Sequence, residues 1–197
     1  MKIRPVILCG GAGTGFGQSK KKHQAKQFID FGGWSLIQKT LERIKKPVFD
    51  YPIISTNLKY LKDVRKSLKK NKVKKYKIVL EPAKKNTGPA ILSSALIKEI
   101  PLEQPLMYFA ADHLIEKSNI LNRSISKNKI NLDDQNIFIF GIKPTNPSSE
   151  YGYFLTKKIK KNINKVTKFI EKPKLAKAKQ IIKNKGYWNS GMFYLRK

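Results

Sequence analysis

Short apolar runs alternate with segments of helical periodicity through the first 142 residues, and this alternation narrows the possible folds more than any other feature. An apolar run of four to six residues indicates a buried strand, whereas apolar residues three or four positions apart indicate a helix. The expected strands are residues 6–9, 52–55, 77–80, 106–110 and 137–142, and the expected helices are residues 35–45, 58–69, 87–100 and 119–130. Strands separated by helices pair in parallel, so we predict an α/β protein with helices on both faces of a mostly parallel sheet.

The pattern changes after residue 142. Strands are expected at 151–156 and 165–170, followed by a helix over 175–185 and a final strand over 192–195. The chain ends two residues after that strand, with no closing helix. We therefore expect one domain, residues 1–197, that lacks its C-terminal part.

The charge favours anionic ligands without identifying one. The net charge is +29, yet only five of the 42 basic residues are arginine. Specific base recognition uses arginine forks and interleaved aromatic side chains, and neither is clustered here. We expect no specific nucleic-acid partner, although nonspecific binding through lysine stays an alternative.

Several other protein classes are excluded. No apolar run approaches the roughly 18 residues that a membrane-spanning helix needs. The N-terminal apolar run is too short for a signal peptide, and the single cysteine, Cys9, rules out an internal disulfide or a cysteine metal cluster. A cytoplasmic protein with no membrane contact is expected.

A glycine-rich turn follows the first expected strand and reads Cys9-Gly10-Gly11-Ala12-Gly13-Thr14-Gly15. Small residues at the end of a strand let backbone N–H groups approach phosphates closely. The dinucleotide pattern and the phosphate-loop pattern both fail, because Phe16 and Gln18 stand where glycine or lysine would be needed. Taken alone, the turn is weak evidence for a phosphate site, and an ordinary strand-to-helix connection is the better interpretation.

Further short motifs follow the turn in a characteristic order. They are Lys26-Gln27-Phe28, Ser35-Leu36-Ile37-Gln38, Glu81-Pro82, Asn86-Thr87, Pro89-Ala90-Ile91, Ala111-Asp112-His113, Gly141-Ile142-Lys143-Pro144-Thr145, Glu150-Tyr151-Gly152-Tyr153, Phe169-Ile170-Glu171-Lys172-Pro173 and Trp188-Asn189-Ser190-Gly191-Met192-Phe193. In this order the chain resembles the nucleotide-sugar pyrophosphorylases, and most closely the mannose-1-phosphate guanylyltransferases. Each motif is weak alone, but the ordered set spans the whole chain and is specific.

The resemblance implies a Rossmann-like nucleotidyltransferase fold, a three-layer α/β/α arrangement around a mostly parallel mixed sheet. It implies transfer of GMP from GTP to mannose 1-phosphate, giving GDP-mannose and pyrophosphate with Mg²⁺ as cofactor. Catalysis of this kind depends on positioning and charge neutralisation rather than on a covalent enzyme intermediate. Transfer from UTP or dTTP is the alternative within the same class.

The resemblance also assigns roles to individual residues. Nucleotide binding is implied for Gly10, Gly11, Ala12, Gly13, Thr14, Glu81, Asn86 and Thr87. Lys26 would contact the phosphates, and Asp112 would hold the metal. Gly152, Glu171, Lys172 and Asn189 would bind the sugar phosphate. Structural alternatives are helix capping for Asp112 and for Asn86-Thr87, and a packing role for His113.

The sequence departs from the family pattern in its signature turn. Gly15 stands where the family has an arginine that binds the polyphosphate, and Lys85 replaces another arginine before Asn86. Loss of one such charged donor costs about 10²–10³-fold in rate, by analogy with removal of an oxyanion-hole donor. Two interpretations follow. The first is a nucleotidyltransferase domain that associates with further copies of itself as a homo-oligomer or with its missing C-terminal part. The second is an impaired paralogue that binds nucleotide sugars or regulates an active subunit.

Overall fold

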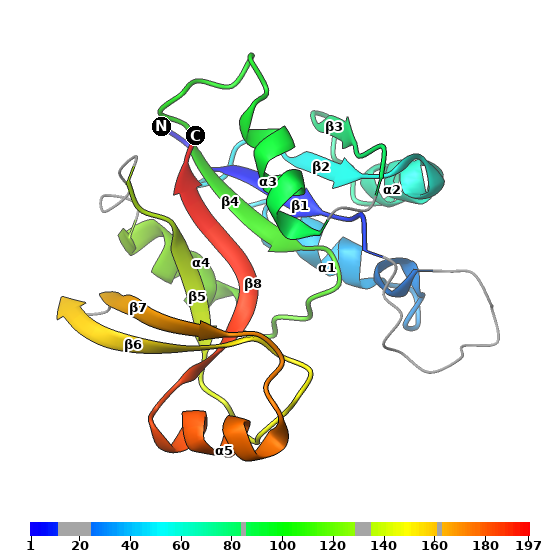
Figure 1. Ribbon diagram of the computed structural model, residues 1–197. Helices are drawn as coiled ribbons and strands as arrows, with labels where there is room; N and C mark the ends of the chain where they lie inside the picture. The colour runs from blue at the N-terminus through cyan, green and yellow to red at the C-terminus, as the bar shows by residue number, and fades with distance from the viewer. Residues whose placement is uncertain (12–24, 84–85, 129–134, 161–162) are drawn as a thin grey trace. The chain divides into compact units, whose positions relative to one another are not determined.

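The computed structural model describes residues 1–11, 25–83, 86–128, 135–160 and 163–197. These residues form two compact units (Figure 1). Unit 1 comprises residues 1–137 and 193–197, and unit 2 comprises residues 138–192. No helix within the described ranges has the length and apolar character needed to cross a membrane.

Unit 1 is built on a mixed sheet. Its parallel strands lie in the order β3 (Lys77–Leu80), β2 (Ile53–Thr56), β1 (Arg4–Leu8) and β4 (Pro105–Ala110). Residues 193–196 of β8 (Tyr187–Arg196) pair antiparallel with β4. The central strands β1 and β4 are buried on both faces, which explains their uninterrupted apolar runs. The predicted parallel α/β arrangement is confirmed.

Helices cover both faces of this sheet (Figure 1). The helices of unit 1 are α1 (Leu36–Arg43), α2 (Leu61–Lys70), α3 (Thr87–Ala95) and α4 (Ser118–Asn128), with short 3₁₀ turns η1 (Lys26–Phe28) and η2 (Leu58–Tyr60). Successive side chains of a strand point to opposite faces. Tyr108 of β4 contacts Ser94 of α3, whereas the next residue, Phe109, packs under Arg43 of α1. The sheet therefore lies between two helical layers.

The bounds of α3 and α2 differ from those that the periodicity predicts. The helix expected over 87–100 ends at Ala95. Proline disfavours a helical conformation of the residue before it, and Pro101 directly follows Ile100. The Lys197 ammonium group donates to the carbonyl oxygens of Ile97 and Ile100, which gives these groups partners outside a helix. The helix expected from residue 58 begins at Leu61, and Leu58, in the 3₁₀ turn η2 before it, is 72% exposed.

Unit 2 is a small antiparallel arrangement packed against one helix. Its elements are β5 (Phe138–Ile142), β6 (Tyr153–Lys160), β7 (Ile163–Ile170), α5 (Leu175–Lys183) and the first part of β8. β6 pairs antiparallel with both β7 and β8. Tyr153, Ala178 and Ile181 form its buried cluster. The expected strands and helix are present, but β8 begins five residues earlier than predicted.

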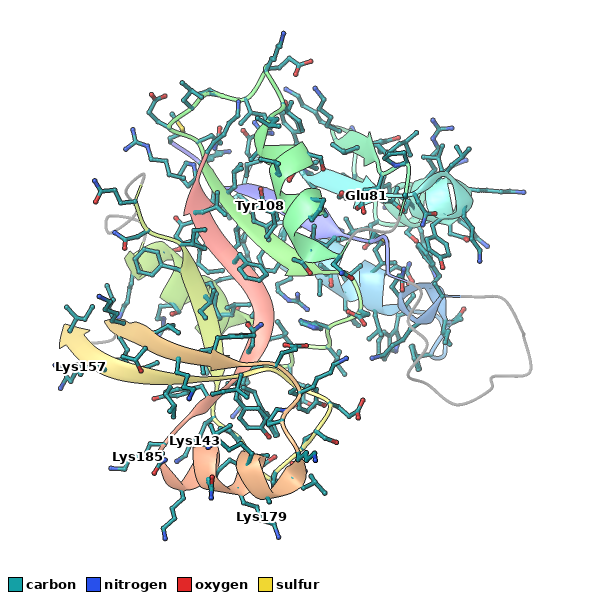
Figure 2. The ribbon with its side chains drawn as sticks, in the orientation of Figure 1. Glu81, Tyr108, Lys143, Lys157, Lys179 and Lys185 are labelled. Carbon is teal, nitrogen blue, oxygen red and sulfur yellow. The ribbon has the colours of Figure 1, made fainter. Side chains whose placement is uncertain are left out.

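The buried hydroxyl of Tyr108 gives a stability prediction for unit 1. Tyr108, labelled in Figure 2, donates to the Ile91 carbonyl at 3.2 Å and accepts from Ser94 Oγ at 3.1 Å. Burial raises the pKa of its phenol to about 12, so the hydroxyl stays protonated. Tyr108→Phe should lower the free energy of unfolding in urea by about 1 kcal/mol, because the hydrogen bond from its hydroxyl to the Ile91 carbonyl is lost inside the core. Ser93→Ala on the exposed side of α3 is the control, and an equal loss there would contradict the explanation.

Candidate functional site

The glycine turn and Asp112 lie at the same edge of the sheet in unit 1. Leu8, the last residue of β1, pairs in parallel with Ala110, the last residue of β4. The Ala111 amide donates to the Leu8 carbonyl at 3.1 Å, which extends the pairing by one step. Gly10 and Asp112 therefore both follow the carboxyl ends of neighbouring strands, which is where open α/β sheets bind ligands (Figure 1).

Glu81 reaches the same edge from β3. Its amide donates to the Thr56 carbonyl at 2.7 Å, and Ser55 Oγ donates to its Oε1 at 2.6 Å. A Cβ atom added at Gly10 would lie 3.2 Å from both carboxylate oxygens. The lack of a side chain at Gly10 thus makes room for the Glu81 carboxylate, which Figure 2 labels. This contact between two predicted nucleotide-binding residues is not evident from their spacing in the sequence.

The Gln27 side chain is hydrogen-bonded to the backbone of the glycine turn, a role that the sequence analysis did not predict. Its Nε2 donates to the Gly11 carbonyl at 3.2 Å and lies 3.5 Å from the Cys9 carbonyl, which also accepts from Thr56 Oγ1 at 3.2 Å. The only sequence signal was its place in the Lys26-Gln27-Phe28 motif. Burial raises the pKa of the Cys9 thiol to about 12, so this cysteine is a neutral packing residue rather than a nucleophile.

Lys26 and Asp112, the two predicted catalytic residues, lie together. Lys26 Nζ is 3.8 Å from Asp112 Oδ2, and the two side chains are 27% and 36% exposed. His113 Nε2 lies 4.0 Å from Asp112 Oδ1. Burial, reinforced by the Arg43 and Lys26 charges, lowers the pKa of His113 despite the opposing effect of Asp112. The imidazole is therefore neutral at pH 7, and the Lys26 ammonium is the cation beside the carboxylate.

The surroundings of Asp112 fit a metal ion that arrives with a phosphate ligand. The helix-capping alternative for Asp112 is wrong, because α4 begins six residues later, at Ser118. Its carboxylate is partly exposed, and its distances of 3.8 Å to Lys26 Nζ and 4.0 Å to His113 Nε2 exceed hydrogen-bonding range. Within the described ranges no group of three or more His, Cys, Asp or Glu residues is placed to hold a metal. One carboxylate, completed by phosphate oxygens and water, is a common environment for Mg²⁺.

The remaining predicted nucleotide residues are only partly described. Asn86 occupies the N-cap position of α3 but makes no side-chain capping hydrogen bond, and its φ is 64°. Asn86 and Thr87 are both exposed, so a capping role is not what holds Asn86 in this left-handed conformation. Ala12, Gly13 and Thr14 lie outside the described residues, as do the departures at Gly15 and Lys85.

Three of the four predicted sugar-phosphate residues meet in unit 2. The Asn189 amide donates to the Gly152 carbonyl at 2.7 Å. A Cβ atom added at Gly152 would lie 2.7 Å from Glu171 Oε2, 2.9 Å from Phe169 Cζ and 3.6 Å from Asn189 Cβ. Lys172, next to Glu171 in the turn after β7, is exposed with a φ of 41°. Glu171 and Asn189 thus place polar side chains around a glycine that leaves them room.

Unit 1 also contains a cavity of about 490 Å³ that is separate from the glycine turn and Asp112. Its lining includes Lys2, which precedes β1, and Pro52, which precedes β2. The cavity therefore opens at the amino ends of these strands. The glycine turn, Glu81 and Asp112 lie at the opposite, carboxyl edge.

Comparison with known proteins places the chain in a family. The model of the nucleotidyl transferase family matches residues 4–197. The mannose-1-phosphate guanylyltransferase of Escherichia coli is 34% identical over 199 residues, which cover 96% of this chain and 43% of the relative. The alginate biosynthesis protein AlgA of Pseudomonas fluorescens is 31% identical, with 98% and 41% covered. The chain spans about two fifths of the length of these curated relatives.

A solved structure supports the same placement. The crystal structure of mannose-6-phosphate isomerase from Helicobacter pylori matches with a TM-score of 0.80 and 30% identity, covering all of this chain and 71% of that chain. Nucleotidyl transferases generally use a divalent metal. The family match extends over nearly the whole sequence and the fold is reproduced in a solved relative, so the chain belongs to the nucleotidyl transferase family.

Proposed function

We propose that residues 1–197 form a nucleotidyltransferase catalytic domain, or part of one, that transfers GMP from GTP to mannose 1-phosphate. The observation that carries the proposal is the convergence of the glycine turn, Glu81, Lys26 and Asp112 at one edge of the sheet in unit 1. The relatives named mannose-1-phosphate guanylyltransferase support the choice of nucleotide and sugar.

Glu81 is the residue that favours guanine. Guanine presents two adjacent N–H donors on its Watson–Crick edge, whereas uracil and thymine present one. An ionised carboxylate has two oxygens and no donor, so it matches the guanine edge and not the others. Ser55 donates to Glu81 at 2.6 Å and orients the carboxylate beside Gly10 before any nucleotide binds. The Gly10 and Gly11 backbone leaves space for the nucleotide to approach this carboxylate.

Asp112 and Lys26 act on the triphosphate. Asp112 would hold Mg²⁺, which neutralises phosphate charge and polarises the phosphoryl oxygens when it is bound. Lys26 contributes a second positive charge next to the carboxylate, at the position where phosphates would lie. The neutral His113 neither competes for protons there nor adds charge. Together the two charged side chains orient the α-phosphate and its pyrophosphate leaving group.

The proposed ligand of unit 2 is the acceptor substrate, mannose 1-phosphate. Glu171 accepts hydrogen bonds from sugar hydroxyls, and the Asn189 side-chain amide can both accept and donate them. The exposed Lys172 pairs with the phosphate of the sugar. A phosphate oxygen of mannose 1-phosphate attacks the α-phosphorus in line. The new oxygen–phosphorus bond forms as the bond to the β-phosphate oxygen breaks, and pyrophosphate carries away the electron pair. No covalent enzyme intermediate is needed.

The Gly15 departure favours a second candidate, an impaired paralogue that binds nucleotide sugars or regulates an active subunit. Release of pyrophosphate from GTP and mannose 1-phosphate separates the two candidates. Rapid turnover by the unmodified chain would eliminate the paralogue. Turnover restored by Gly15→Arg, by about 10²–10³-fold, would identify a damaged enzyme instead.

The guanine preference is tested by Glu81→Gln. The amide of glutamine keeps one acceptor oxygen and adds N–H donors that oppose those of guanine, so GTP affinity should fall by about tenfold or more. Affinity for UTP and dTTP should change by less than about twofold, since these bases make a single donor contact. Calorimetric titration of the three nucleotides with Mg²⁺ measures both. Ser55→Ala, which removes the orienting hydroxyl, is expected to show the same preference loss in smaller degree.

Equal weakening of all three nucleotides by Glu81→Gln would contradict the base-reading role of Glu81. Failure of the unmodified protein to bind either GTP or GDP-mannose would contradict the nucleotide site altogether.

A further inference from the structure

We infer that Arg43 is a positioning residue that clamps the turn carrying Asp112. Arg43 is the last residue of α1, and its side chain crosses to the end of β4, 70 residues further along the chain. Its Nη2 donates to the backbone carbonyl of His113 at 3.1 Å. The inference rests on the proposed function only for the role of Asp112 as a metal ligand. The contact between Arg43 and the His113 carbonyl does not depend on that function.

The turn is held at both ends. On one side the Ala111 amide donates to the Leu8 carbonyl at 3.1 Å, and on the other the Arg43 guanidinium holds the His113 carbonyl. Asp112 stands between these two anchors, so the direction of its carboxylate depends on both. Arg43 is itself fixed, because Asn122 of α4 donates to its backbone carbonyl at 3.4 Å. The arrangement links two helices to the backbone beside the proposed metal ligand.

Arg43 is an unfavourable residue for stability alone. It is only 5% exposed, and no carboxylate forms an ion pair with it among the described residues. Its Nε and Nη1 atoms are buried and have no hydrogen-bond partner in the described parts of the chain. The face of the Phe109 ring, 5.9 Å away, is its other favourable neighbour. A buried cation with unsatisfied donors costs free energy, and such costs concentrate at functional positions.

The balance of these effects points to preorganisation. Among the described residues, the hydrogen bond that the Arg43 side chain donates goes to the residue that follows Asp112, whereas the cost of burying the guanidinium lowers the stability of the folded protein. A catalytic carboxylate displaced by about 1 Å loses much of its effect, so a rigid support for the turn serves the chemistry more than the fold. Arg43 therefore acts on Asp112 through the His113 carbonyl.

Arg43→Met is the first test, because methionine keeps most of the volume and removes the charge and all the donors. Hydrogen exchange of the Ala111 amide, which donates to the Leu8 carbonyl at the other end of the turn, should speed up by about tenfold in the protein alone, as expected for loss of roughly one hydrogen bond's stabilisation. The urea midpoint should stay unchanged or rise, since the unsatisfied buried donors are gone. Arg43→Lys keeps the charge without the planar fork and should show a smaller effect in the same direction.

Thr40→Val is the matched control. Thr40 lies on the same helix, is fully buried, and has a hydroxyl without a partner among the described residues. Thr40→Val also removes an unsatisfied buried group. Among the described residues, however, no hydrogen bond or ion pair joins the Thr40 side chain to the turn at residues 111–113. Exchange of the Ala111 amide should therefore match that in the unmodified protein. Faster exchange of the turn in Thr40→Val would overturn the specific role of Arg43.

The second readout is binding of Mn²⁺ in the presence of GTP, followed by electron paramagnetic resonance. Arg43→Met should weaken Mn²⁺ binding by about tenfold through misplacement of Asp112, with Arg43→Lys between it and the unmodified protein. Unchanged Mn²⁺ binding and unchanged exchange in both variants would overturn the inference. If the unmodified protein binds no Mn²⁺ with GTP while the variants still exchange faster, the clamp holds and the proposed function fails.

Discussion

Asp112→Asn is expected to lower the rate of pyrophosphate release by about 10²–10³-fold or more, because asparagine keeps the shape of the side chain but removes the charge that holds the metal. The structure makes the change specific. Asp112 is the carboxylate at the end of β4, its ion-pair partner Lys26 is 3.8 Å away, and α4 does not depend on it as a cap. The free energy of unfolding should therefore change little, since exposed ion pairs contribute about 0–1 kcal/mol.

The rate is followed by coupled detection of pyrophosphate at saturating GTP and mannose 1-phosphate. Glu116→Gln is the control, because Glu116 is an exposed carboxylate four residues further along the same loop and its loss changes the net charge equally. A rate for Asp112→Asn within about threefold of the unmodified protein would refute the metal role, given that metal ligands contribute several kcal/mol. Matching losses in both variants would indicate a general charge effect.

Gly152→Ala is expected to weaken mannose 1-phosphate binding by about 30-fold, or roughly 2 kcal/mol, because the new methyl group displaces Glu171. The added carbon would lie 2.7 Å from Glu171 Oε2 and 2.9 Å from Phe169 Cζ. Both atoms end flexible side chains, and Phe169 is 48% exposed, so these side chains can swing away at a small cost in stability. The variant should fold normally yet bind the sugar phosphate poorly, which calorimetry and urea unfolding measure separately.

Gly186→Ala is the control, and we expect it to lower stability while leaving mannose 1-phosphate binding unchanged. A carbon there would overlap the Ile181 side chain and lie 2.9 Å from the Ile181 backbone oxygen. The backbone of α5 cannot move aside as a side chain can, so this variant should lose about 1–3 kcal/mol of stability through overpacking. Below its unfolding temperature it should keep the affinity for mannose 1-phosphate. Retained affinity in Gly152→Ala would show that Glu171 does not contact the sugar phosphate.

The backbone layout of unit 1 was predictable from local sequence. Each buried strand appears as a short apolar run, since a central parallel strand is covered on both faces. The helix boundaries were less predictable, because they depend on partners distant in sequence. The end of α3 is an example: the Lys197 ammonium takes the carbonyls of Ile97 and Ile100, a contact that spans about 100 residues.

Some residues of the candidate site were predictable from local motifs, whereas others depend on contacts between distant parts of the chain. Lys26, Asp112 and the glycine turn were identified by motif, and the structure brings Lys26 and Asp112 within 3.8 Å. Gln27 was not identified as a support for the turn, because its two acceptors are backbone carbonyls that any residue possesses. The assigned roles of these residues stay predictions until the variants are measured.

The amino-acid sequence by itself determined the order of strands and helices, the parallel sheet and the family, because these depend on apolar periodicity and on short motifs that the chain carries locally. Only the tertiary structure decided that Gly10 makes room for Glu81, that Gly152 does so for Glu171, and that Arg43 is buried to hold the turn after β4. Contacts between residues tens of positions apart arise when strands pair and helices pack. Their geometry is therefore a property of the folded chain and leaves no local pattern in the sequence.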